Sequence, residues 1–185
     1  MAFNVQQFRA SLVNDGARAS LFEVTMNLPP AAGFTAIDQE VRFKARATSL
    51  PGDSISSISV PYFGREIKVA GTRTFPQWSF TVINDENFRI RNQMEIWMSG
   101  LNAHVANLRS PAMAMSSMYS ADAWVTQFAK TGAIIKQYKI VGAFPTDVSA
   151  IDLDWASGDQ IEEFSVTFEY QWWESLVPIP TTDGF

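Results

Sequence analysis

Residues 150–174 read AIDLDWASGDQIEEFSVTFEYQWWE, an acidic and turn-rich stretch that runs into alternating apolar and polar side chains. The predicted apolar face holds Phe164, Val166, Phe168, Tyr170 and Trp172. The opposite face holds Glu163, Ser165, Thr167, Glu169 and Gln171. Alternation with a period of two among β-branched and aromatic residues predicts an antiparallel strand with one buried face.

Three earlier segments alternate in the same way and predict further strands. They are 20–28 (SLFEVTMNL), 41–47 (VRFKARA) and 75–83 (FPQWSFTVI). The predicted buried side chains of these strands include Val24, Met26, Val41, Phe43, Trp78, Phe80 and Val82. The repeated pattern predicts a mainly β, antiparallel fold.

Residues 84–104 (NDENFRIRNQMEIWMSGLNAH) break the strand pattern, because their apolar residues recur at helical spacing. The recurring residues are Ile90, Met94, Trp97, Met98 and Leu101. The spacing predicts one flanking helix over about 85–99, closed by Gly100. Its predicted cap is Asn84 or Asp85, and its predicted outward side chains are Arg89 and Gln93. A shorter helix is predicted over about 4–13, and a Met-rich surface loop over 109–121.

The segment 48–74 (TSLPGDSISSISVPYFGREIKVAGTRT) is rich in Ser, Gly and Pro in its first half, yet it also carries many apolar side chains. These are Leu50, Ile55, Ile58, Val60, Tyr62 and Phe63. Solvated linkers do not usually hold so many apolar residues. Two interpretations stand: a hairpin that folds back on its own core, or a surface that binds another chain.

Composition excludes several classes of protein. The 185 residues fit one domain, and the lack of cysteine excludes disulfides and thiolate metal sites. No apolar run approaches the roughly 18 residues that span a bilayer, and the first residues lack a secretory signal. A soluble protein made in a cytoplasm is expected.

Charge is distributed unevenly along the chain. Residues 1–139 hold 14 bases and 10 acids, whereas residues 140–185 hold 9 acids and no base. The basic residues Arg42, Lys44, Arg46, Arg65, Lys68 and Arg73 are interleaved with acids and do not form the positive stripe that tight phosphate binding requires. The asymmetry predicts either an acidic surface with its own partner or acids that pair with these bases.

The acidic stretch resembles a calcium loop only in part. With Asp152 at the first position, Ala156 takes the fifth, where an oxygen ligand is needed. A hairpin turn through 156–159 is predicted instead, with Ile151, Leu153 and Trp155 on a buried strand face. His104 is the only histidine, and no catalytic or nucleotide-binding motif is present. The sequence therefore predicts no catalytic residue, no metal site and no cofactor.

Two long stretches are similar to the tail tube proteins of contractile-tailed bacteriophages. They are 43–97 and 134–174, and together they cover about half of the chain. Within them, the resemblance rests on GREIKVAGTRTF (64–75), VINDE (82–86), FPTDV (144–148) and LDW (153–155) in this order.

The resemblance implies an antiparallel β-sandwich or barrel with a flanking helix, forming a single tail-tube domain over 1–185. It implies hexameric rings with a continuous inner β-barrel, which stack into the tube through which DNA is ejected. The implied partners are further copies of the chain, the tail sheath, baseplate and tail terminator proteins, and a tape-measure protein in the lumen. DNA would pass without specific binding, and no small-molecule substrate is expected. The implied location is the virion, after synthesis in the host bacterial cytoplasm.

Within this resemblance, 48–66 is expected to be an extended loop that contacts another subunit or ring, and 176–185 a C-terminal tail. The expected contact residues are Leu50, Ile55, Ile58, Val60, Tyr62, Phe63 and Arg65. The residues expected to face the lumen are Glu163, Thr167, Glu169 and Gln171.

Alternative functions remain at this point. The same architecture would suit the tube of a type VI secretion system, a phage-tail-like bacteriocin or a baseplate protein. A carbohydrate-binding β-sandwich would instead use exposed aromatic residues such as Trp172 and Trp173 beside acids.

Overall fold

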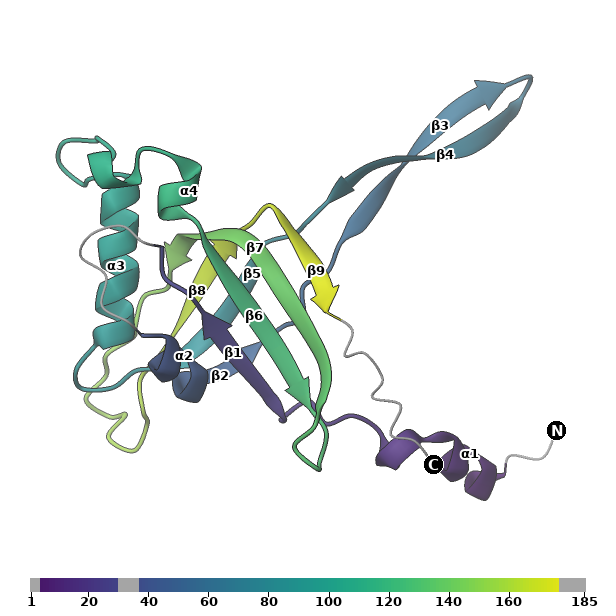
Figure 1. The fold of residues 1–185 in the computed structure, drawn as a ribbon, viewed down its shortest axis with the longest axis horizontal. Helices are drawn as coiled ribbons and strands as arrows, with labels where there is room; N and C mark the ends of the chain where they lie inside the picture. The colour runs from purple at the N-terminus through teal and green to yellow at the C-terminus, as the bar shows by residue number, and fades with distance from the viewer. Residues whose placement is uncertain (1–3, 30–36, 177–185) are drawn as a thin grey trace.

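The computed structural model describes residues 4–29 and 37–176, which form a strand-built body from which a long hairpin and a short N-terminal helix project (Figure 1). The helices are α1 (Val5–Ser11), α2 (Asp38–Lys44), α3 (Arg89–Leu101) and α4 (Ser116–Tyr119), with 3₁₀ turns at Val13–Asp15 and Pro111–Met113. The strands are β1 (Phe22–Met26), β2 (Ala45–Thr48), β3 (Ser54–Tyr62), β4 (Arg65–Thr74), β5 (Trp78–Ile83), β6 (Ala121–Phe128), β7 (Ile134–Val148), β8 (Glu163–Glu169) and β9 (Trp172–Leu176). None of the helices in the described ranges is long and apolar enough to cross a membrane.

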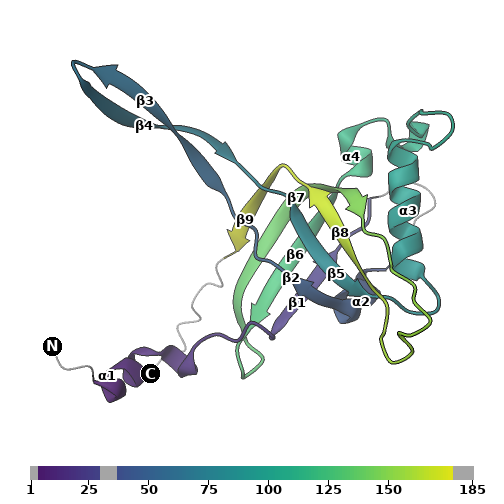
Figure 2. The ribbon, with the colours of Figure 1, turned by 180° about the vertical axis from the view of Figure 1, so that it is seen from behind.

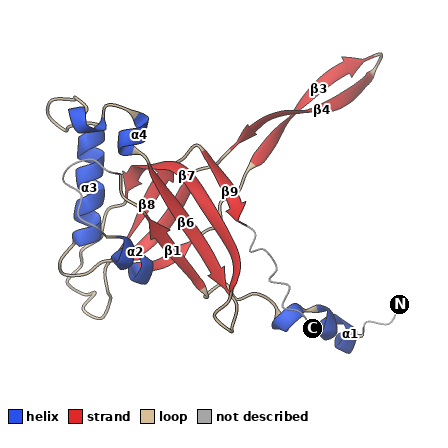
Figure 3. Cartoon of the chain, viewed as in Figure 1, coloured by secondary structure: helices blue, strands red, loops and turns tan. Residues whose placement is uncertain are grey.

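Seven strands form one sheet in the order β1-β6-β7-β8-β5-β2, with β9 also paired to β7 (Figure 3). Every pairing is antiparallel, as predicted. The 15-residue β7 pairs with β6 and β9 along its first part and with β8 along its last part, so it joins the two halves of the sheet. In the described part of the chain, β1, β2 and β9 each pair along one side only, which leaves three open edges.

The core lies on the inner face of this sheet, where α3 covers it. Trp78, Phe80 and Phe168 form an aromatic cluster with ring centroids 5.2–5.6 Å apart. Trp97 of α3 meets Phe168 edge-on at 6.2 Å, and its Nε1–H donates a 2.8 Å hydrogen bond to the carbonyl oxygen of Tyr119. The predicted burial of Ile90, Met94 and Trp97 is confirmed.

The predicted start of this helix is wrong by about one turn, and its end by two residues. Phe88 has φ +51°, which a helix cannot contain, so α3 begins at Arg89 rather than at Asp85. Gly100 lies inside the helix and does not end it. The position requires a small residue, because a Cβ there would lie 2.6 Å from Met113 Sδ. Gln93, predicted to face outward, is buried.

The strand predicted over 41–47 is also wrong in its first half, which belongs to α2. Ile37 and Val41 are four residues apart and both buried, and the Val41 N–H donates to the Ile37 carbonyl oxygen at 2.9 Å. Phe43, predicted to be buried, is 80% exposed. Acids in the first turn of α2 and bases in its last turn complement the helix dipole. This interaction favours a helix over the strand that the alternation of residues 41–44 predicts.

A cluster of charges joins α2 to the segment before α3. Lys44 Nζ lies 2.5 Å from Asp85 Oδ2 and 3.4 Å from Glu40 Oε2, and Glu40 also pairs with Arg89. The hydrogen bond from Lys44 lowers the pKa of Asp85. Burial lowers the pKa of Lys44, but its hydrogen bonds to Asp85 and Glu40 outweigh this effect, so the net pKa is raised.

We expect Asp85→Asn to reduce stability at neutral pH, and the deficit to shrink in acid. A lowered folded-state pKa contributes stability above the ordinary value of 3.8, and this contribution is lost as the pH falls through the lowered value. The raised pKa of Lys44 keeps the amine charged until above 10.5, so the difference between the proteins should stay flat from about pH 5 to 9. Urea unfolding of both proteins from about pH 2 to pH 9 measures the difference. A deficit independent of pH down to about 2 would contradict the role of the pair.

The strand predicted around Ile151, Leu153 and Trp155 is wrong, and the turn predicted over 156–159 is present but lies within a loop rather than between two paired strands. Residues 149–162 form a loop, in which the Ala156 and Ser157 N–H groups bond to the side chain and the carbonyl oxygen of Asp154. Leu153 and Trp155 are exposed rather than buried. Asp154 offers the chain a local turn, which competes with strand pairing.

The final predicted strand is divided in two. β8 buries Phe164, Val166 and Phe168 as predicted, and Tyr170 follows them into the core. The chain then bends at Gln171, and β9 begins on the edge of β7, so Trp172 is exposed rather than buried.

Candidate assembly surfaces

The β3–β4 hairpin projects away from the body of the protein (Figures 1 and 2). Its two-residue turn is Phe63-Gly64, with φ values of +42° and +81°. Positive φ at both central positions is the type I′ geometry whose twist matches that of paired strands. Phenylalanine is a poor residue for this conformation, and its ring is 92% exposed at the tip. A strained, exposed aromatic residue of this kind indicates a functional site.

The strand register sorts the hairpin into two different faces. Cross-strand pairs Ile58–Val69, Val60–Ile67 and Tyr62–Arg65 lie on one face, because alternate residues of a strand share a side. The opposite face carries the pairs Ser57–Ala70, Ser59–Lys68 and Pro61–Glu66. We call the first the apolar face, formed by Ile58, Val60, Tyr62, Arg65, Ile67 and Val69.

The apolar face has no cover from the described part of the chain. All five of its apolar side chains are about half exposed. Near the base of the hairpin, a bulge places Gly71 against this face, where a Cβ would lie 2.4 Å from Ser56 Oγ. A contiguous exposed apolar patch on a protruding element marks a site of interaction with another protein.

The structure groups only some of the predicted contact residues. Ile58, Val60, Tyr62 and Arg65 share the apolar face, and Phe63 lies at its tip. Ile55 lies near the base, paired with Arg73, and Leu50 lies before the hairpin. Ile67 and Val69 were not among the predicted contact residues, although their alternation after the Phe-Gly turn is the signal that places them opposite Val60 and Ile58.

Of the residues predicted to face a lumen, Glu163, Thr167 and Glu169 lie on the outer face of β8. Thr167 lies opposite Ser79 of β5, and Thr81 Oγ1 is 3.1 Å from Ser165 Oγ, so hydroxyl groups dominate this surface. Glu169 accepts a 2.9 Å hydrogen bond from Gln77. Gln171 does not belong to this face, because it lies at the bend after β8.

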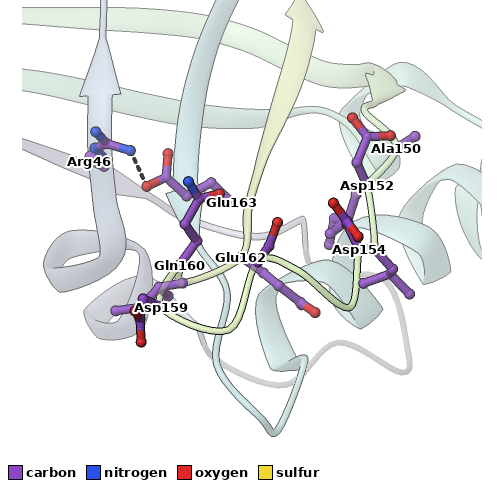
Figure 4. Close-up of a pocket in the computed structure, with 12 residues that line it drawn as sticks. Arg46, Ala150, Asp152, Asp154, Asp159, Gln160, Glu162 and Glu163 are labelled. Carbon is purple, nitrogen blue, oxygen red and sulfur yellow. Dashed lines mark hydrogen bonds and ion pairs between the residues drawn. The ribbon is translucent and has the colours of Figure 1, made fainter.

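One predicted pairing between a C-terminal acid and a base is present: Glu163 of β8 forms an ion pair with Arg46 of β2 (Figure 4). Arg42 pairs instead with Glu23 of β1, at 2.8 Å, outside the acidic C-terminal region. The pairing of Glu163 follows the second interpretation of the charge asymmetry, in which acids neutralise nearby bases.

The loop 149–162 carries a second exposed surface, beside the first turn of α3. Its carboxylates Asp152, Asp154, Asp159 and Glu162 line a depression with Arg46 and Glu163 (Figure 4). None of these four forms an ion pair with a described residue; Glu162 accepts a hydrogen bond from Asn84 at 2.9 Å. Leu153, Trp155 and Ile161 project from the same loop and are exposed.

Neither a cluster of metal ligands nor a sugar-binding platform is present among the described residues. Across the described residues, no group of three or more His, Cys, Asp or Glu side chains could hold a metal ion. Trp173 stacks edge-on against Tyr138 at 5.4 Å and donates to the Gly52 carbonyl oxygen, whereas Trp172 is an adjacent strand residue that points the other way. The two indoles therefore do not form one platform.

Comparison with known proteins identifies the family. A model of the phage tail tube protein family matches residues 17–176. The chain belongs to this family. The tail tube protein gp19 of Enterobacteria phage T4 is 33% identical over 167 residues, covering 90% of this chain and 96% of that protein. The family predicted from the sequence is thus confirmed.

Solved structures share the fold. A chain of the six-fold symmetrised baseplate of the anti-feeding prophage superposes with a TM-score of 0.63 at 13% identity, covering 87% of this chain and 95% of that chain. A chain of the sheath–tube complex of the PVC extracellular contractile injection system gives 0.60 at 12% identity, covering 96% and 100%. This chain thus shares its fold with components of contractile injection machines.

Proposed function

We propose that the chain forms hexameric rings that stack into the inner tube of a contractile phage tail, the conduit for DNA ejection. The observation that carries the proposal is membership of the tail tube family over residues 17–176. The role is structural and needs no catalytic residue, metal or cofactor. Residues 1–185 would act as one tail-tube domain; the C-terminal tail predicted over 176–185 lies, from residue 177 onward, outside the described residues.

Two features of the fold support self-assembly. Exposed sheet edges invite pairing with other chains, and β1, β2 and β9 each leave one edge open in the described part of the chain. Joining such edges between subunits around a ring gives a closed inner barrel, which removes the edges. The apolar face of the hairpin would then contact a neighbouring subunit or ring through Ile58, Val60, Tyr62 and Arg65, with Phe63 at the tip.

The outer face of β8, with Thr167 and Glu169, would line the lumen. A surface of hydroxyl groups and scattered carboxylates offers few sites to phosphate, so DNA slides along it without being held. Glu163 contributes little charge to this lumen-facing surface, because its ion pair with Arg46 neutralises it. Gln171 would lie at the edge of the lumen rather than on the outer face of β8.

We expect Glu169→Lys to leave tube formation intact and to make the tube retain DNA. Sixfold symmetry turns each substitution into a ring of six positive charges, and multiple charged contacts bind DNA with a steep salt dependence. The measurement is binding of linear DNA to assembled tubes at low and high salt. Lys130→Glu, in the turn between β6 and β7, serves as a control: it changes the charge in the opposite direction and lies away from the outer face of β8. Unchanged DNA retention by the Glu169→Lys tubes would contradict the lumen assignment.

The proposed partners follow from the same role. The chain would contact the tail sheath on its outside, the baseplate and tail terminator proteins at the two ends, and a tape-measure protein in the lumen. It would be made and assembled in the cytoplasm of the host bacterium and function in the virion. The similar chains from a baseplate and from a sheath–tube complex support these classes of partner.

Negative-stain electron microscopy of the concentrated protein tests the proposal. We expect hollow rods built from stacked rings. Dispersed single subunits at every concentration and salt would contradict self-assembly. A tube of a non-viral contractile injection system is the second candidate, because the solved structures with this fold come from such machines; neighbouring genes for capsid and DNA-packaging proteins distinguish the two.

A further inference from the structure

The loop 149–162 exposes apolar side chains that the body of the protein does not use. Trp155 is fully exposed, and Leu153 and Ile161 are mostly exposed. Leu153 and Ile161 line a depression together with Asp152, Asp154, Asp159 and Glu162, and Trp155 follows Asp154 in the same loop. A large indole held in water beside an open groove indicates a surface that another chain covers.

The charge of this loop restricts the chemistry of its partner. Residues 149–162 hold four acids and no base. These four acids form no ion pair with a described residue, so the loop attracts a basic surface. The occupant must therefore combine positive charge with exposed apolar side chains.

The β3–β4 hairpin of this chain has both properties. Residues 54–74 hold three bases, Arg65, Lys68 and Arg73, and one acid, Glu66. Arg73 pairs with Asp53 at 2.9 Å, whereas Arg65 and Lys68 near the tip form no ion pair with a described residue. The apolar face and the ring of Phe63 supply the complementary apolar surface.

The hairpin and the loop lie at opposite ends of the molecule (Figures 1 and 2). One molecule therefore cannot satisfy both surfaces, but two copies arranged head to tail can. A contact between two different surfaces of identical chains is heterologous, so it repeats and gives rings or filaments.

We propose that the 149–162 loop is the receptor for the β3–β4 hairpin of a second copy of this chain. Arg65, which shares the apolar face, would meet the carboxylates of Asp152 and Asp154, and Phe63 at the tip would pack against Trp155. The inference rests on the proposed self-assembly and names the two surfaces that meet in it.

Site-directed cross-linking tests this pairing, because the chain has no cysteine of its own. Phe63→Cys and Trp155→Cys proteins are mixed, assembled into tubes and treated with a short bismaleimide. We expect a covalent dimer in the mixture and its loss when either variant is assembled alone. Ser79→Cys on the outer face of β5 replaces Trp155→Cys in the control mixture, which should give no dimer. Tubes whose mixture of the first two variants gives no more dimer than the control would overturn the inference, yet leave the proposed function standing.

A charge exchange tests the same contact if the cysteine variants do not assemble. We expect Arg65→Glu alone, or Asp154→Lys alone, to raise the critical concentration for tube formation about tenfold or more. The protein with both substitutions should return to within about threefold of the wild type, because the attraction is restored with its sign exchanged. A combined variant that assembles no better than the weaker of the two single variants would overturn the pairing. Failure of the wild-type protein to assemble would instead count against the proposed function.

Discussion

Trp97→Ala should lower the free energy of unfolding by about 3–5 kcal/mol, the range for replacing a fully buried large aromatic side chain with alanine. The Trp97 side chain is completely buried at the centre of the face that α3 packs on the sheet. The substitution opens a cavity beside Phe168 and leaves the carbonyl oxygen of Tyr119 without its 2.8 Å hydrogen bond. Urea unfolding of the unassembled protein, followed by circular dichroism, measures the change.

Ile96→Ala is the matched control for this prediction. Ile96 precedes Trp97 on the same helix but is substantially exposed, so we expect a change below about 1 kcal/mol. Similar losses in the two variants would show that α3 does not pack through its Trp97 face.

Replacing Val60 and Ile67 with serine should abolish tube formation without unfolding the subunit. The two residues form a cross-strand pair on the apolar face and contact no buried core residue. Burial of each side chain in a neighbouring subunit would stabilise assembly by about 1.5–3 kcal/mol, so losing both raises the critical concentration by roughly 100-fold or more. Sedimentation over a concentration series measures the effect, and thermal unfolding of the unassembled protein should be unchanged.

The opposite face of the hairpin provides a control of equal size. Ser57→Ala combined with Ala70→Ser exchanges the two residues of a cross-strand pair that faces away from the apolar side. This protein should form tubes at the wild-type concentration. Equal loss of assembly in both double variants would mean that the hairpin acts through its backbone or its length, rather than through its apolar face.

Residue patterns were sufficient to predict much of the fold. Alternation correctly predicted that Val24, Trp78, Phe80 and Phe168 are buried, because the side chains of a strand point alternately to its two faces. Helical spacing correctly predicted that Met94 and Trp97 are buried, because residues three or four apart lie on the same side of a helix.

Other elements could not be read from local pattern, because contacts distant in sequence decide them. Residues 41–44 alternate like a strand, but Lys44 pairs with Glu40 one turn earlier and with Asp85 far along the chain, and these contacts favour a helix. The composition of residues 109–121 predicts a surface loop, but Met113 is buried and packs against Gly100.

The candidate surfaces were predicted less completely than the core. Excess apolar residues in 48–74 indicated a binding segment, but the division into two faces depends on the register fixed by the Phe63-Gly64 turn. The role of residues 149–162 was misread, because Ile151, Leu153 and Trp155 alternate like a buried strand. Only the structure places Leu153 and Trp155 in water beside the acids.

Cryo-electron microscopy of the assembled wild-type protein, classified in end-on and side views, tests the central claim of a stacked hexameric tube most directly. We predict six-fold rings around an open lumen, with the β3–β4 hairpin of each subunit seated on a neighbouring copy. Rods without a lumen, rings of another symmetry, or hairpins that project freely into solvent would contradict it.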